Sequence, residues 1–331
     1  MTSRVWTDVD YERDGKQVGW LYLPHSVTRS GYGHLATPVA VLKNGNAGPT
    51  VLLMAGNHGD EYEGQIALAR LIRTLDPARL SGRLILLPMA NVAAAAAGVR
   101  VSPLDGGNLN RAFPGDADGG PTSAMAHYYA TVLFPLASAL IDLHSGGTSM
   151  NYLPFASYCR SGDAATDARS HALLEAFAAP LSIVWDAVDQ RMAEMEASRR
   201  RLAAISGEFG GGATVTPSGL AIVERGLSSA LAHLGMLASD PPAKVENSRW
   251  LEIPNAAFYV YAASAGVFEP LVALGQTVAA GDPCGLIHFV EEPLREPVLC
   301  RFGVPGLVVC MRQPARVERG DCLAHLARDV E

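Results

Sequence analysis

Short apolar segments alternate with amphipathic ones over much of the chain, and this alternation constrains the fold more than any other feature. The apolar runs are typical of buried strands. Between them, apolar residues recur at i, i+3, i+4 and i+7, the spacing of a helix that buries one face. The predicted strands cover 18–23, 37–42, 50–54, 83–88, 139–144, 181–185 and 202–206. Such alternation predicts an α/β domain built on a largely parallel sheet.

The intervening segments predict helices over 68–75, 122–132 and 216–234. Thr122 or Ser123 is expected to cap the second helix. Thr216 is expected to cap the third, because a proline follows it at the first helical position.

A change of composition at 238–243, where two prolines are adjacent, indicates a domain boundary. Helical periodicity is absent from Trp250 onward, and short strands replace it. We therefore predict an α/β domain over residues 1–238, which includes the N-terminal strands, and a β-rich domain over 239–331.

A weak internal repeat runs through the β-rich part. Segments 266–282 and 306–321 start alike and both end in a Gly-Asp pair, about forty residues apart. The two copies resemble the halves of a biotinyl or lipoyl carrier barrel. Carriers need a lysine at a hairpin tip, and no lysine follows Lys244. A barrel-sandwich fold without the carrier chemistry is the prediction.

Charge and cysteine content narrow the classes of partner. The formal net charge of −7 disfavours a nucleic-acid partner, which would require an excess of basic residues. No apolar stretch is long enough to span a bilayer. The five cysteines form no Cys-x-x-Cys pair, which disfavours a structural zinc site. An odd cysteine count without a secretory leader suits the cytoplasm. The sequence leaves open whether the chain forms a homo-oligomer.

Three potential metal ligands follow two of the predicted strands. His58 and Glu61 are three residues apart after the strand 50–54, and His144 ends the strand 139–144. Ligands in such sheets bind beyond the carboxyl ends of strands, and catalytic zinc takes three protein ligands and a water. We predict one zinc ion on these residues, with Asp60 and Glu63 orienting or solvating the loop. The alternative is a solvated loop with hydrogen-bonded structural histidines.

Glu208 also stands at the end of a predicted strand, and three glycines closely follow it. A carboxylate is the usual base for a zinc-activated water, so Glu208 is the predicted catalytic base. An exposed glutamate in a flexible turn is the alternative interpretation, and Glu224 and Glu269 are the rival bases.

The segment 100–115 lies between the two metal loops and supplies candidates for substrate binding. Asn110 and Arg111 could bind a substrate carboxylate, the arginine through two hydrogen bonds. Arg100 could polarise a carbonyl and stabilise the oxyanion. A solvated, arginine-bearing loop is the alternative.

Four stretches in order, "GNHGDE", "NRAFPG", "DLHSGG" and "EFGGG", resemble the succinylglutamate desuccinylase and aspartoacylase family of the zinc carboxypeptidase superfamily. The resemblance covers roughly residues 35–330. It implies a mixed, largely parallel sheet flanked by helices and a β-rich C-terminal domain lining the entrance. It also implies zinc on His58, Glu61 and His144, with Glu208 as base and acid.

The chain departs from the family pattern at two positions. Arg100 stands a little farther upstream of Arg111 than in aspartoacylases. Asn108 stands where the family commonly has aspartate before Leu-Asn-Arg. The stretches "VSPLDGGNLNRAFPG" and "GVFEP" are most similar to the bacterial N-α-acetyl-diaminobutyrate deacetylases of ectoine breakdown.

These observations predict a zinc amidohydrolase that removes a small acyl group from an amino acid. The first alternative is a zinc carboxypeptidase that acts on short peptides. The second is a non-catalytic protein that only binds acyl-amino acids.

Overall fold

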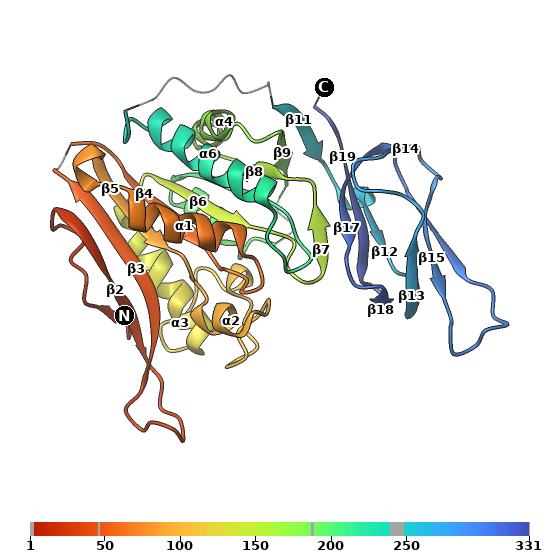
Figure 1. Ribbon diagram of the computed structural model, residues 1–331, viewed down its shortest axis with the longest axis horizontal. Helices are drawn as coiled ribbons and strands as arrows, with labels where there is room; N and C mark the ends of the chain where they lie inside the picture. Colours follow the sequence, from red (N-terminus) through yellow and green to blue (C-terminus); the bar gives the residue numbers. More distant parts are fainter. Residues whose placement is uncertain (1–2, 46, 187–188, 239–247, 331) are drawn as a thin grey trace.

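A 15-stranded mixed sheet runs through the computed structural model, which describes residues 3–45, 47–186, 189–238 and 248–330 (Figure 1). Its strand order is β1-β2-β3-β5-β4-β6-β10-β8-β9-β11-β19-β17-β14. The first ten strands are β1 (Trp6–Thr7), β2 (Gly15–Pro24), β3 (His34–Asn44), β4 (Thr50–Ala55), β5 (Gly82–Leu87), β6 (Ala139–His144), β7 (Met150–Tyr152), β8 (Phe155–Cys159), β9 (Leu181–Trp185) and β10 (Ala203–Glu208). Every strand predicted before residue 210 is therefore confirmed.

Helices cover both faces of this sheet. They are α1 (Glu63–Thr74), α2 (Val92–Ala97), α3 (Pro121–Tyr128), α4 (Ala164–Phe177), α5 (Ala193–Arg199) and α6 (Pro217–His233). One apolar core joins α1, α4 and α6 to the sheet, and a second joins α3 and α5 to its other face. The central strands β5, β4, β6 and β10 are parallel and almost wholly buried, as expected when both faces are covered.

The predicted helices over 68–75 and 216–234 are confirmed, with Thr216 as the cap of α6. The predicted cap of the second helix is wrong, because α3 has Gly120 as its N-cap and Pro121 as its first residue. Thr122 lies in the first turn, where its backbone and side chain both donate to Asp105. Proline at the first helical position fixes the start two residues earlier than a cap at Thr122 would.

Helices α2, α4 and α5 were not predicted, and the sequences of α4 and α2 explain why those two were missed. The buried face of α4 includes Thr166 and Ser170, and the Ser170 hydroxyl accepts a hydrogen bond from the backbone of Ala204. Polar residues on the buried face hide the helical periodicity. Helix α2 has the sequence Val-Ala-Ala-Ala-Ala-Ala. Because alanine occupies all sides of this helix, no apolar residues recur at helical spacing and no amphipathic pattern is visible.

Within residues 248–330 the C-terminal part is all-β apart from one short 3₁₀ turn. Its strands pair with one another in antiparallel fashion, and four of them form a second, separate sheet. Its strands are β11 (Arg249–Ile253), β12 (Tyr259–Tyr261), β13 (Gly266–Pro270), β14 (Thr277–Val278), β15 (Pro283–His288), β16 (Val298–Arg301), β17 (Gly306–Arg312), β18 (Arg316–Val317) and β19 (Cys322–Asp329). Strand β13 pairs with β18, and β17 pairs with β14. The long strand of each sequence copy thus pairs with the short strand of the other copy.

The two Gly-Asp turns of the repeat have the same structure. Gly281 and Gly320 have φ values of +88° and +91°. In each turn the following aspartate accepts a hydrogen bond from the backbone three residues earlier, at 2.7 Å for Asp282 and 2.9 Å for Asp321. The repeat read from the sequence is therefore also a structural repeat.

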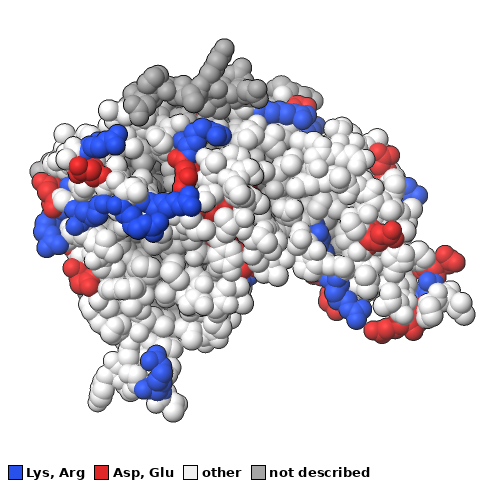
Figure 2. Space-filling view, in the orientation of Figure 1, with Lys and Arg blue, Asp and Glu red and all other residues white. Residues whose placement is uncertain are grey.

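The sheet connects the two regions. Strand β11 pairs in parallel with β9, and β7, which follows the His144 loop, pairs with β17. The predicted domain boundary, between residues 238 and 239, adjoins the segment 239–247, which lies outside the described residues. Figure 2 shows acidic and basic side chains interspersed over the visible face. Among the helices that the structure describes, none is long and apolar enough to cross a membrane.

Candidate active site

Neighbouring parallel strands bring the predicted site residues to one edge of the sheet. In the sheet register, His144 at the end of β6 lies opposite Glu208 at the end of β10. Strand β4 pairs with the other side of β6, and the loop after it carries His58 and Glu61. The carboxyl ends of these three strands therefore meet, as the sequence predicted.

Glu61 lies between the two histidines. His58 Nδ1 is 2.7 Å from Glu61 Oε1, and His144 Nδ1 is 2.8 Å from Glu61 Oε2. One ligand atom from each residue lies within 4.8 Å of the others, and all three side chains are buried. Two imidazole nitrogens and a carboxylate at this spacing are a donor set for zinc.

The outer nitrogens of both histidines are held by oxygen acceptors. His144 Nε2 lies 2.9 Å from Asp142 Oδ2, and His58 Nε2 lies 3.1 Å from the Asn108 side-chain oxygen. In the tautomer in which Nε2 donates to these oxygens, each Nδ1 faces Glu61 and can present its lone pair to a metal. The three residues thus fit a metal ion in chemistry as well as in spacing. Asn108 fills the position of the family aspartate with a neutral acceptor.

The charges of the three residues are strongly coupled. Burial alone raises the pKa of Glu61, but His58 and His144 outweigh it and hold that pKa below its usual range. Burial lowers the pKa of His58, with partial opposition from Glu61. Burial also opposes protonation of His144, but Asp142 and Glu61 raise its pKa above the ordinary value.

Asp60 and Glu63 orient the site and do not face solvent. Asp60 accepts a hydrogen bond from the Thr148 backbone at 2.6 Å. Glu63 accepts from the Ser145 hydroxyl at 2.6 Å and from the Thr216 backbone at 3.1 Å. Both carboxylates are buried. They tie the metal loop to the loops that follow β6 and β10, so the expectation of solvation is wrong and that of orientation is confirmed.

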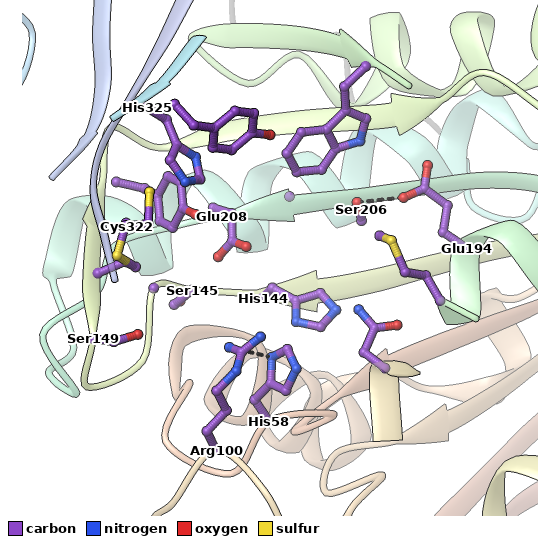
Figure 3. A pocket seen from close by; sticks show the side chains of 18 of the residues that line it. His58, Arg100, His144, Ser145, Ser149, Glu194, Ser206, Glu208, Cys322 and His325 are labelled. Carbon is purple, nitrogen blue, oxygen red and sulfur yellow. Dashed lines mark hydrogen bonds between the residues drawn. The ribbon is translucent and has the colours of Figure 1, made fainter. Parts of the chain in front are cut away.

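Glu208 faces the cavity beside the candidate metal ligands His58 and His144 (Figure 3). Its Oε2 is enclosed without a hydrogen-bond partner among the described residues. Burial, followed by the negative charge of Glu61, raises the Glu208 pKa to about 8. The rival bases lie elsewhere: Glu224 pairs with Arg70 on the surface, and Glu269 pairs with His288 and is half exposed.

Arg100, predicted to stabilise the oxyanion, lines the same cavity of about 480 Å³ as Asn110 and Arg111, which were predicted to bind substrate. Arg100 Nη1 lies 3.3 Å from His58 Nδ1 and 3.6 Å from Glu61 Oε1, next to the metal ligands. Arg111 Nε lies 3.6 Å from Asp189 Oδ2. The Asn110 side-chain oxygen accepts from the Ala193 backbone at 2.8 Å, which leaves the Asn110 amide nitrogen for a ligand.

The all-β region forms part of the cavity wall, as the family resemblance implied. Its cavity residues are Tyr259, Tyr261, Arg312, Asp321, Cys322 and His325. Burial lowers the pKa of His325 to about 3. Glu194, on α5, also lines the cavity and was not predicted. An acidic residue near a helix N-terminus is common, so nothing in the sequence indicated a site there.

All five cysteines are free, and four of them are buried.

A family model matches more than half of the chain. The succinylglutamate desuccinylase/aspartoacylase catalytic domain matches residues 47–234. An N-α-acetyl-L-2,4-diaminobutyric acid deacetylase from Halomonas elongata is 40% identical over 330 residues, which is 99% of this chain and 96% of the relative.

Solved structures have the same fold over the full length. The product-bound ectoine utilization protein EutE from Ruegeria pomeroyi has a TM-score of 0.95 at 35% identity, over 99% of this chain and 100% of that one. A succinylglutamate desuccinylase/aspartoacylase from Rhodobacter sphaeroides has a TM-score of 0.94 at 37% identity, with the same coverage.

Proposed function

Because the chain belongs to the succinylglutamate desuccinylase/aspartoacylase family, we propose that it is a zinc-dependent deacetylase of N-α-acetyl-2,4-diaminobutyrate. One observation carries the proposal: a buried His58–Glu61–His144 cluster beside Glu208 in a cavity sized for a small molecule. The substrate assignment is supported by the full-length similarity to the Halomonas elongata deacetylase. The five free cysteines support a cytoplasmic location.

One zinc ion per chain, held by His58, Glu61 and His144, would supply a Lewis acid that makes water nucleophilic at neutral pH. Glu208 takes the proton from the attacking water and delivers it to the leaving amine. Arg100 places its guanidinium beside the cluster, where it stabilises the negative charge that develops on the carbonyl oxygen. Asn110 and Arg111 hold the α-carboxylate of the amino acid.

Arg111→Ala is expected to raise KM about 10- to 100-fold, with a smaller effect on kcat, because a hydrogen-bonded charge that holds the substrate carboxylate is lost. Steady-state kinetics on the acetylated amino acid and on its carboxamide measure this effect. With the carboxamide as substrate, Arg111→Ala should raise KM much less.

Arg191→Ala is the matched control, because Arg191 pairs with the same Asp189 at 2.8 Å yet does not line the cavity. An equal rise of KM in both variants would assign the effect to the position of Asp189 and would contradict carboxylate binding by Arg111.

Product detection with the zinc-loaded protein tests the proposed function as a whole. The panel contains N-acetyl, N-succinyl and N-formyl amino acids and short peptides. Release of acetate from N-α-acetyl-2,4-diaminobutyrate is the expected result. Preferential release of a C-terminal residue from peptides would identify a carboxypeptidase. Binding of acyl-amino acids without any product would identify a non-catalytic binding protein.

A further inference from the structure

Five acidic residues line the cavity, and their partners differ. Three of them have a cationic or imidazole partner: Asp142 with His144 at 2.9 Å, Asp186 with Arg160 at 3.6 Å, and Asp321 with Arg312 at 2.9 Å. In the part of the chain that the structure describes, neither Glu208 nor Glu194 has a basic side chain within 4.0 Å. Glu208 has a role as the proposed base, so Glu194 is the acid left to explain.

Glu194 is buried, with an exposed fraction of only 2%. One carboxylate oxygen accepts from the Cys159 backbone, and the other accepts from the Ser206 hydroxyl at 2.9 Å. The Cys159 side chain is a further hydrogen-bond partner of this carboxylate. Because two carboxylate oxygens can accept about four hydrogen bonds, the group retains capacity for one more donor. Figure 3 shows Glu194 and Ser206 on one side of Glu208, with Cys322 and His325 on the other.

The spacing along β10 relates Glu194 to the reacting bond. Ser206 and Glu208 are two residues apart and face the same side of the sheet. Their Cα atoms are therefore about 6.6 Å apart. The leaving amide nitrogen must lie near Glu208, which protonates it. In 2,4-diaminobutyrate about 5 Å separates the two nitrogens when the side chain is extended. The second nitrogen therefore reaches the neighbourhood of Ser206 and Glu194.

The proposed carboxylate site lies beside the same helix. Asn110 accepts from the backbone of Ala193, the residue directly before Glu194. The α-carboxylate and the side chain of one amino acid would thus be held by adjacent parts of the wall, as the leaving half of the substrate requires.

We propose that Glu194 is a specificity-determining residue that binds a primary ammonium group on the substrate side chain. The inference rests on the proposed function and adds the group that selects a diamino acid over neutral amino acids. An ammonium group supplies the positive charge that is missing beside this carboxylate, and it supplies a further hydrogen-bond donor. Burial raises the Glu194 pKa to about 7, the direction expected for a buried carboxylate whose counter-charge arrives with the ligand.

The test compares two substrates of equal size, N-α-acetyl-2,4-diaminobutyrate and N-acetylnorvaline, in which a methyl group replaces the ammonium. The measured quantity is the ratio of their kcat/KM values. We expect wild type to favour the diamino substrate about 100-fold, the scale of a hydrogen-bonded charge. In Glu194→Gln the ratio should fall close to one.

Glu196→Gln is the matched control. Glu196 lies on the same helix, is also buried, and pairs with Arg199 and Arg200 outside the cavity lining. Its variant should keep the wild-type ratio. An unchanged ratio in Glu194→Gln, or an equal fall in both variants, would overturn the proposal and leave Glu194 with a structural role.

A second measurement uses wild type alone and holds even if Glu194→Gln does not fold. Free 2,4-diaminobutyrate should inhibit about 100-fold more strongly than free norvaline. Equal inhibition constants, or equal hydrolysis of both acetylated substrates, would overturn the role of Glu194 while the deacetylase function stands. Hydrolysis of neither substrate would overturn the proposed function, and this inference with it.

Discussion

Replacing Glu208 by glutamine is expected to lower kcat by at least about 10²–10⁴-fold, the usual contribution of a general base. Glutamine keeps the shape and most hydrogen bonding of the side chain but cannot accept the proton of the attacking water. The metal content should not change, because Glu208 is not one of the three proposed ligands. KM should move little if Asn110 and Arg111 supply most of the binding.

The measurement pairs steady-state kinetics with metal analysis of the same preparation. Glu269→Gln is the control, since Glu269 lies on β13, pairs with His288 and does not line the cavity. Near-normal turnover by Glu208→Gln would show that another carboxylate is the base. Activity that falls together with the metal content would instead show that Glu208 helps to hold the ion.

Replacing His144 by alanine is expected to remove both the metal and the activity. Wild type should carry about one zinc per chain, held by three protein ligands. The change leaves two ligands, and Asp142 loses the imidazole that it orients at 2.9 Å. Elemental analysis after dialysis, with activity on the acetylated amino acid, measures the outcome.

His233→Ala is the control for this change, because His233 is exposed at the end of α6. Active wild-type protein without a bound divalent ion would refute the metal site. Full metal retention by His144→Ala would remove His144 from the ligand set.

The strands were predictable because their burial follows from local sequence. The runs 139–144 and 181–185 coincide with β6 and β9 in the structure. Helix α4 was not predictable, because Thr166 and Ser170 occupy its buried face and satisfy their hydroxyl groups there. Periodicity detects apolar faces, and it fails where a buried face is polar but hydrogen-bonded.

The ligands of the candidate site were predictable from their place after strands, but their supports were not. His58, Glu61 and His144 stand close to strand ends that the sequence reveals. The contacts of Asn108 with His58 and of Glu63 with Thr216 join residues 50 and 153 positions apart. Contacts of that range depend on the folded chain. Glu194 could not be predicted for the same reason. It stands out only because no cation lies beside it in the described part of the folded chain.

The parallel pairing of β11 with β9 affects how this chain can be divided. Five residue pairs join the two strands, from Arg249 with Leu181 to Ile253 with Trp185. A protein shortened to end after α6 would leave Leu-Ser-Ile-Val-Trp of β9 as an uncovered, mostly apolar strand. Such edges recruit strands from other molecules and promote aggregation. The shortened protein would also lack the cavity wall formed by Tyr259 and His325. For expression and for exchange between relatives, the α/β region and its β-rich partner are therefore best treated as one inseparable piece.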